Sequence, residues 1–388
     1  MAGTDGLGPV TGEPDTALGP VLVVGTGLVG TSVALALRAT DVSVHVVDQD
    51  ERLAKLAEDL GAGVAGLPGS DPQVVIVAVP PAAVGPVIGA YSRLYLNAIF
   101  IDVASVASNP QRDVETLGAA VARRYVGGHP MAGRERSGPT AAQPDLFRDR
   151  PWVLTPTAET PGEVLELARR VVRACGADLV EMSPARHDEA VALVSHLPQV
   201  VATLTASRLR DRDADLVALA GQGVRDVTRI AASDPRLWIE ILDANAVALS
   251  GVLRELQTEL ALVSEAVETL ARQAKSTSRD VDEAASRQEA LSVIAGVLEH
   301  GNAGRARIPG KHGGRPTEFA VVTVVVPDRP GELARIFVAA GEAQVNIEDV
   351  ALEHAAGHPV GTVLLHVREA SVPVLVAALT DSGWSVHA

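Results

Sequence analysis

The chain has 388 residues, of which 47% are hydrophobic and only 3% aromatic, and its net charge is -15 at pH 7. A chain of this length is too long for one compact core, so we expect two or three domains with aliphatic interiors. The negative charge argues against nucleic acid and an anionic membrane as partners, and it means that an anionic substrate needs a local arginine cluster.

The first segment, residues 1–17, is rich in glycine, proline, threonine and aspartate, and it lacks the basic and apolar regions of a signal peptide. We therefore expect a disordered tail. No apolar run is expected to reach membrane-spanning length. The one cysteine, Cys175, excludes a disulfide framework and a cysteine-rich metal site, which favours a cytoplasmic protein without a bound metal.

From residue 18 to about 183, strands alternate with helices. The continuous apolar run Val21–Gly25 is typical of a strand buried on both faces of a parallel sheet, and Gly27–Thr40 follows it as a helix. Further elements are expected at Val42–Val47, Val74–Val79, Ala98–Val103, Trp152–Leu154 and Asp178–Met182 as strands, and at Gly162–Cys175 as a helix. The alternation predicts an α/β domain with a Rossmann-type doubly wound sheet.

A glycine-rich turn, Gly25-Thr26-Gly27-Leu28-Val29-Gly30, joins the first strand to the first helix. Its glycines let the backbone approach a pyrophosphate, which would lie at the positive end of the helix. Asp48 ends the second strand, where a carboxylate accepts hydrogen bonds from ribose hydroxyls and repels a 2′-phosphate. Val79 and Pro80 end another strand close to the expected nicotinamide position. These residues predict NAD as the cofactor.

From residue 184 to about 300, long segments rich in alanine, leucine and glutamate predict an all-helical domain. A helix such as Leu237–Gln273 is too long and apolar to be covered by one chain, so we expect a substrate and dimerisation domain in a homodimer. Residues 301–317 are rich in glycine, proline and arginine and are interpreted as a linker.

Residues 318–388 return to strands. The expected order is Phe319–Val326, helix Gly331–Gly341, Asn346–His354, Thr362–Arg368, helix Val372–Ser382 and Trp384–His387. This is a βαββαβ unit, which predicts a small α+β domain separate from the first sheet.

Several polar motifs could carry chemistry. His129 lies in Gly127-Gly128-His129-Pro130-Met131-Ala132-Gly133 after the strand-like Arg124–Val126, where a neutral imidazole can act as a general base near pH 7. Ser105 follows another strand. The helical half contributes Ser195-His196-Leu197-Pro198-Gln199 and the stretch from Gly221 to Trp238, with Arg225, Asp226 and Arg229. Asp226 and Arg229 are three residues apart, so on a helix they share a face and can pair.

Together these motifs resemble the prephenate/arogenate dehydrogenase family of tyrosine biosynthesis, in its actinobacterial form with a C-terminal ACT domain. The resemblance implies that His129 is the catalytic histidine and that Ser105 hydrogen-bonds both His129 and the substrate hydroxyl. It implies that Arg229 binds the ring carboxylate of the substrate, in related dimers from the neighbouring subunit, with Trp238 at the pocket edge. Further substrate contacts are expected from His196, Gln199 and Arg225.

The implied reaction is an NAD-dependent oxidative decarboxylation of a cyclohexadienyl substrate, prephenate or arogenate, to 4-hydroxyphenylpyruvate or tyrosine. The sequence departs from the family pattern at Gln199, where many relatives have histidine, and at Ala107, where lysine is frequent. A neutral Gln199 can hydrogen-bond an amino-acid side chain without repelling its ammonium, which favours arogenate slightly. The amino analogue 4-amino-4-deoxyprephenate is the alternative substrate.

Two alternatives of other classes remain. A 3-hydroxyacid dehydrogenase is disfavoured because lysine is scarce between Lys55 and Lys275. A catalytically inactive amino-acid sensor is disfavoured by the intact His129, Ser105 and Arg229.

The C-terminal segment Pro327-Asp328-Arg329-Pro330-Gly331-Glu332-Leu333 resembles the ligand-binding turn of the ACT domain. This implies regulatory contacts from Asp328, Pro330, Gly331 and Asn346. Tyrosine or another amino acid is the expected effector, by analogy with pathway control.

Overall fold

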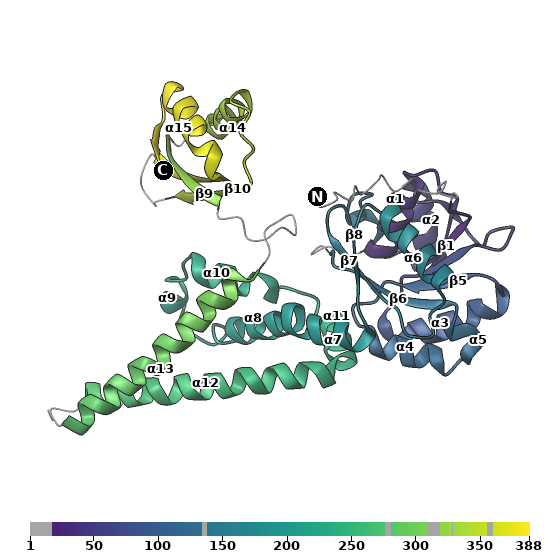
Figure 1. The fold of residues 1–388 in the computed structure, drawn as a ribbon, viewed down its shortest axis with the longest axis horizontal. Coiled ribbons are helices and arrows are strands. Elements are labelled where there is room, and N and C mark those ends of the chain that lie inside the picture. The colour runs from purple at the N-terminus through teal and green to yellow at the C-terminus, as the bar shows by residue number, and fades with distance from the viewer. Residues whose placement is uncertain (1–17, 134–137, 276–280, 309–318, 328, 355–359) are drawn as a thin grey trace, which may run out of the picture. The chain divides into compact units, whose positions relative to one another are not determined.

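The computed structural model describes residues 18–133, 138–275, 281–308, 319–327, 329–354 and 360–388 (Figure 1). The chain divides into two compact units, Met1–Ala261 and Leu262–Ala388, and the division falls inside helix α12 (Ala246–Ala274). The expected tail at 1–17 lies outside the described residues, and so does most of the expected linker.

The first unit is built on an eight-stranded sheet in the order β3-β2-β1-β4-β5-β6-β7-β8. All neighbouring strands are parallel except β6 and β7, which are antiparallel. The strands are β1 (Val21–Val24), β2 (Val44–Val47), β3 (Val64–Ala65), β4 (Val74–Val77), β5 (Ile99–Asp102), β6 (Tyr125–Pro130), β7 (Pro151–Thr155) and β8 (Asp178–Glu181). The predicted α/β doubly wound sheet is confirmed.

Helices cover both faces of this sheet, and each face has its own apolar core. One core joins α1, α2 and α6 to the sheet around Trp152 and Phe147, and the other joins α3 and α4 around Phe100 and Tyr125 (Figure 1). The helices are α1 (Leu28–Arg38), α2 (Glu51–Asp59), α3 (Pro81–Leu94), α4 (Ser108–Glu115), α5 (Ala119–Ala122) and α6 (Gly162–Ala174), with a 3-10 turn η1 (Pro139–Ala141). Burial on both faces explains why these strands are continuous apolar runs.

The rest of the first unit is helical, as predicted. Its elements are α7 (Pro184–Val191), a π-helical turn η2 (Ala192–His196), α8 (Leu197–Ser207), α9 (Ala214–Val217), α10 (Gln222–Thr228), a 3-10 turn η3 (Arg229–Ala231), α11 (Pro235–Ala244) and the first part of α12. The expected single helix Leu237–Gln273 is wrong, because α11 ends at Ala244, Asn245 caps it, and α12 begins at Ala246.

The continuous helix Pro184–Ser207 contains an 18-residue window with a mean hydropathy of 1.3, so by length and composition alone it is apolar enough to cross a membrane. The expectation that no segment reaches this length is therefore wrong. The helix also carries His187, Asp188 and His196, whose side chains are buried inside the unit, while 28% of the apolar window is buried.

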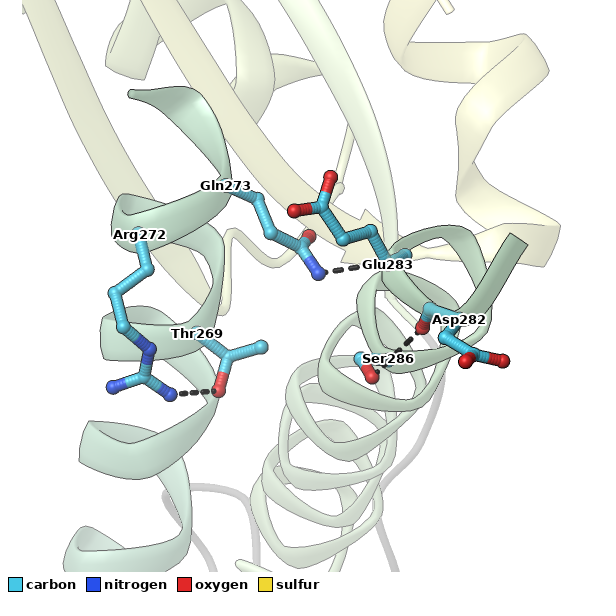
Figure 2. A pocket seen from close by; sticks show the side chains of 6 residues that line it. All are labelled: Thr269, Arg272, Gln273, Asp282, Glu283 and Ser286. Atoms are coloured by element: carbon cyan, nitrogen blue, oxygen red, sulfur yellow. Dashed lines mark hydrogen bonds between the residues drawn. The ribbon is translucent and has the colours of Figure 1, made fainter. Parts of the chain in front are cut away.

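The second unit contains the end of α12, α13 (Val281–Ala306) and a small α+β domain. Because α13 continues to Ala306, the expected linker boundary at 301 is wrong. A hollow of about 380 Å³ lies between α12 and α13, and Figure 2 shows the side chains that line it. There Arg272 donates to Thr269 at 3.0 Å, and Gln273 donates to the Glu283 carbonyl at 2.8 Å. The first bond lies within α12, and the second joins α12 to α13.

The α+β domain has the predicted βαββαβ order, and its antiparallel sheet is ordered β10-β11-β9-β12. Its elements are β9 (Phe319–Pro327), α14 (Glu332–Glu342), β10 (Asp349–His354), β11 (Val360–Arg368), a 3-10 turn η4 (Glu369–Ser371), α15 (Val372–Asp381) and β12 (Ser385–His387) (Figure 1). Alternate residues of β9 and β11 enter one core with Ile336, Leu375 and Trp384.

Candidate active site

The glycine-rich turn holds the N-terminus of α1 against the sheet. A Cβ atom on Gly30 would lie 2.0 Å from the Gly25 carbonyl oxygen, so only glycine allows this approach. Gly27, the residue before α1, has open space beside its Cα atom. No side chain caps α1 and no acidic residue lies in its first turn. The N–H groups of this turn, including that of Leu28, therefore form an open, positively polarised site that fits a pyrophosphate.

Asp48 lies beside this turn. Its Oδ2 atom accepts hydrogen bonds from the Thr26 backbone N–H at 2.7 Å and from the Thr26 hydroxyl at 3.0 Å. Its Oδ1 atom accepts one from the Asp50 N–H at 3.0 Å, which leaves acceptor capacity for a ribose hydroxyl. Val79 lies against Gly25 at the same edge of the sheet, and Pro80 is the N-cap residue of α3.

His129 is the fifth residue of β6, because the strand continues beyond the expected Arg124–Val126 through Gly127 and Gly128. A Cβ atom on Gly128 would lie 2.6 Å from the Asp102 carbonyl oxygen. Glycine at this position therefore lets β6 lie close to the end of β5, and this places His129 at the edge where the glycine-rich turn lies.

His129, which is half-buried, forms part of a chain of three side chains with the buried His187 and Asp188, and the sequence did not reveal this chain. Its Nδ1 atom lies 2.8 Å from Nε2 of His187, and the two rings meet edge to face at 73°. Nδ1 of His187 lies 2.9 Å from Oδ1 of Asp188. His187 and Asp188 lie on α7, 58 or more residues away in sequence, so only the fold brings them to His129.

Asp188 also anchors the N-terminus of α4. Its Oδ1 atom accepts from the Ala107 N–H at 2.8 Å, and its Oδ2 atom accepts from the Ser108 N–H at 2.9 Å. Burial acts to raise the pKa of Asp188, but the hydrogen bonds from His187, Ser108 and Ala107 outweigh it and lower that pKa. Asp188 is therefore ionised near neutral pH and acts only as an acceptor.

The electrostatic environment keeps His129 neutral. Burial, reinforced by His187 and His196, lowers the pKa of His129 from 6.5 to about 3, against the opposing effect of Asp188. Burial also lowers the pKa of His196. Within the described part of the chain, Nε2 of His129 has no hydrogen-bond partner, so an unprotonated nitrogen there would be available to a bound molecule.

A second histidine is fixed by Asn245, the residue that separates α11 from α12. The Asn245 Nδ2 atom donates to the backbone carbonyl of Asp188 at 2.9 Å and lies 3.1 Å from Nδ1 of His196. A carbonyl can only accept, so the contacting Asn245 atom is the amide nitrogen, and Nδ1 of His196 accepts. His196 then carries its proton on Nε2. It lies in the π-helical turn, a distortion that often occurs at functional sites.

Other predicted residues surround this core. The ring of Trp238 lies 6.1 Å from that of His196, nearly perpendicular to it. Gln199 is buried one turn after His196, so the two share a face of the helix. Ser105 follows β5 and is half-buried, and the described contacts of His129 include no hydrogen bond from it.

The two arginines are not part of this network. Arg225 and Arg229 are exposed, on α10 and on the 3-10 turn that packs against α8. The expected pair between Asp226 and Arg229 is wrong, because α10 ends at Thr228 and Asp226 accepts from Gln222 at 2.7 Å instead.

Asp102 is a further buried acid that the sequence analysis did not single out for chemistry. It accepts hydrogen bonds from the Tyr125 hydroxyl and, at 2.8 Å, from the Ala104 N–H. Burial nevertheless raises the pKa of Asp102 to about 6. Among the described residues no group of three or more His, Cys, Asp or Glu side chains is arranged to hold a metal ion.

Two family models match the chain. The model described as prephenate dehydrogenase, nucleotide-binding domain, matches residues 33–181, and the model described as prephenate dehydrogenase, dimerization domain, matches residues 183–279. The chain is 34% identical over 369 residues to the probable prephenate dehydrogenase NovF of Streptomyces niveus, covering 94% of this chain and 99% of that protein. It is 32% identical over 253 residues to the cyclohexadienyl dehydrogenase of Zymomonas mobilis, covering 62% and 85%.

Solved structures of a prephenate dehydrogenase and an arogenate dehydrogenase are also similar to this chain. The prephenate dehydrogenase of Aquifex aeolicus, in complex with hydroxyphenyl propionate and NAD+, has a TM-score of 0.62 at 27% identity, covering 74% of this chain and 99% of that one. The arogenate dehydrogenase of Synechocystis has a TM-score of 0.58 at 27% identity, covering 72% and 99%.

Proposed function

The chain belongs to the prephenate dehydrogenase family, and from this premise we propose that it oxidises and decarboxylates prephenate or arogenate with NAD. One observation carries the proposal: a histidine kept neutral by burial lies at the same carboxyl edge of the sheet as the glycine-rich turn. The products are 4-hydroxyphenylpyruvate or tyrosine.

The glycine-rich turn and Asp48 would hold the NAD pyrophosphate and the adenosine ribose, as the open space at Gly27 allows. Val79 and Pro80 would border the nicotinamide half. When bound, NAD supplies the hydride acceptor.

His129 removes the proton of the substrate hydroxyl through Nε2 while a hydride leaves the same ring carbon. The bond to the ring carboxylate then breaks, carbon dioxide departs, and its electron pair makes the ring aromatic. His196 offers an N–H donor from the same side of the site without adding a positive charge. The protein thus contributes orientation and a base, and aromatisation supplies the driving force.

The test replaces the proposed general base, His129. His129→Asn should lower kcat by ~10²–10⁴ and leave KM nearly unchanged, because it removes a proton acceptor and no carboxylate-binding group. NADH formation is followed with prephenate, arogenate and the amino analogue, each alone. A variant that keeps most of its turnover would remove His129 from the mechanism. Failure of all three substrates with the unmodified protein would refute the proposed function.

Substrate choice is assigned to Gln199. A charged histidine there would favour the extra negative charge of prephenate, whereas the neutral amide accommodates the ammonium of arogenate. Gln199→His should therefore raise the prephenate-to-arogenate ratio of kcat/KM by ~10-fold or more, the scale of one charged hydrogen bond of ~1.5–3 kcal/mol. An unchanged ratio would mean that Gln199 has no role in selectivity.

The ring carboxylate is assigned to Arg229, with Arg225 nearby. Because Arg229 is exposed in one chain, we place it at the site of a partner subunit in a homodimer. Leu219, Ile239 and Val247 are 83%, 67% and 91% exposed, so this unit has large apolar side chains that a partner could cover. A monomer in light scattering at assay concentration would refute this assignment.

For the C-terminal domain we propose an ACT-like amino-acid sensor in a cytoplasmic enzyme. Its βαββαβ sheet order supports this. Gly331, the N-cap residue of α14, has a φ of 92°, and the turn that it forms after Pro330 would present backbone N–H groups to a carboxylate. Asn346 donates to Glu348 at 2.8 Å, and Asp328 lies outside the described residues. Tyrosine should lower the initial rate of the full chain and not that of a Gly331→Val variant.

A further inference from the structure

In the chain of contacts His129–His187–Asp188, the last two members have no role in the proposed reaction. Resting on that proposed function, we infer that His187 and Asp188 are positioning residues that fix the tautomer of His129, so that its Nε2 atom is the proton acceptor. The hydrogen-bond partners determine which ring nitrogen carries the proton, first in His187 and then in His129.

The starting point is Asp188. Both of its oxygens accept backbone N–H groups of Ala107 and Ser108, so the carboxylate is oriented and ionised. The atom 2.9 Å from Oδ1 is Nδ1 of His187, which must therefore be the donor. When His187 is in its neutral form, this is its single ring proton, and its Nε2 atom is then an acceptor.

The position of the ring proton on His129 follows from its contact with His187. Its Nδ1 atom is 2.8 Å from the Nε2 acceptor of His187, so Nδ1 of His129 carries the proton. Nε2 is then unprotonated and has the lone pair that the reaction needs. Without His187 the ring could place its proton on Nε2 and present a donor to the substrate hydroxyl.

The chain also bears on the charge formed in the reaction. When Nε2 takes the substrate proton, His129 becomes an imidazolium in a site that disfavours charge. Its Nδ1–H can shift toward Nε2 of His187 as the His187 Nδ1–H shifts toward Asp188, which spreads the charge toward the carboxylate. His187 is 1% exposed, so this stabilisation is little screened by solvent.

The second histidine makes the arrangement specific. Asn245 donates to Nδ1 of His196 and gives it the opposite tautomer, with a proton on Nε2. The site therefore presents one acceptor and one donor, each set by a different partner. Two rings held by one non-selective network would not differ in this way.

The test combines a spectrum with kinetics. In protein labelled with ¹⁵N-histidine, the His129 signals, assigned by their loss in His129→Gln, should show a protonated Nδ1 and an unprotonated Nε2. His187→Leu should populate the Nε2–H form and lower kcat by ~10²-fold or more, within the range of a general base. His187→Gln keeps an acceptor near the Nε2 position, and it should restore at least a tenth of wild-type kcat and the wild-type tautomer.

His300→Gln, on the exposed face of α13, is the matched control and should change neither readout. An Nε2–H tautomer in the wild type would overturn the inference, as would equal kcat for the two His187 variants. If the tautomers are as stated but no cyclohexadienyl substrate is oxidised, the proposed function fails and the positioning chain stands. If the folded wild type turns over substrate but His129 carries its proton on Nε2, the positioning inference fails and the proposed function stands.

Discussion

Lowering the pH from 8 to 5 should leave kcat/KM of the free enzyme nearly unchanged, although its base is a histidine. An ordinary imidazole with a pKa of 6.5 is only ~3% neutral at pH 5. Burial, with His187 and His196, lowers the pKa of His129 to about 3, so ~99% of it stays neutral at pH 5. The two cases differ by roughly 30-fold in competent base, which an initial-rate assay resolves easily.

The assay records initial NADH formation at limiting cyclohexadienyl substrate and saturating NAD across this pH range. Two nearby groups could add their own pH-dependent change in kcat/KM. They are His196 and Asp102, and burial raises the pKa of Asp102 to about 6. The profile is therefore repeated with Asp102→Asn and His196→Gln. A one-proton loss of kcat/KM centred between pH 6 and 7 that persists in both variants would refute the reasoning about His129.

Three further outcomes are expected. Asp48→Ser should raise the NADP-to-NAD ratio of kcat/KM by at least ~10-fold, the scale of one charged hydrogen bond; equal turnover with both cofactors before mutation would contradict the role of Asp48. Asn245→Ala leaves the Asp188 carbonyl and Nδ1 of His196 without a buried donor, and should lower the free energy of unfolding by about 2–4 kcal/mol in denaturant titrations. Because the pKa of Asp102 is raised from 3.8 to about 6 by folding, its ionisation disfavours the folded state. The unfolding free energy should therefore fall as the pH rises from about 4 to 6, and Asp102→Asn should remove a decrease of about 3 kcal/mol; identical pH dependences would count against this.

The nucleotide-binding half could be predicted from sequence because its determinants are local. A strand buried on both faces needs only apolar residues, so Val21–Val24 and Val74–Val77 are visible as continuous runs. The glycine-rich turn is equally local, since the close approach of Gly30 to Gly25 involves residues of one short segment. The ends of the elements differ by a few residues, because capping and fraying depend on neighbours.

The polar core could not be predicted because its contacts join distant segments. His129 meets His187 across 58 residues, and Asn245 meets His196 across 49. In the sequence, His187 and Asp188 are an ordinary polar pair at the start of an amphipathic helix. Asn245 is equally inconspicuous inside an apolar helical pattern, and only the structure shows that it ends α11. Both are recognised through the groups they satisfy in the fold.

The location of Asp188 has a consequence for how the first unit can move. Its carboxylate holds the N-terminus of α4, which belongs to the nucleotide-binding half, while its neighbour His187 holds His129 on β6. Asn109 adds a third contact across the same boundary by donating to the Ala244 carbonyl at 2.8 Å. A motion that separated the nucleotide-binding half from the helical half at this boundary would break the hydrogen bonds that position His129. It would also leave buried polar groups unpaired. Adaptation to different substrates is therefore expected in Gln199 and Arg229, which lie outside these bonds, while the base itself stays fixed.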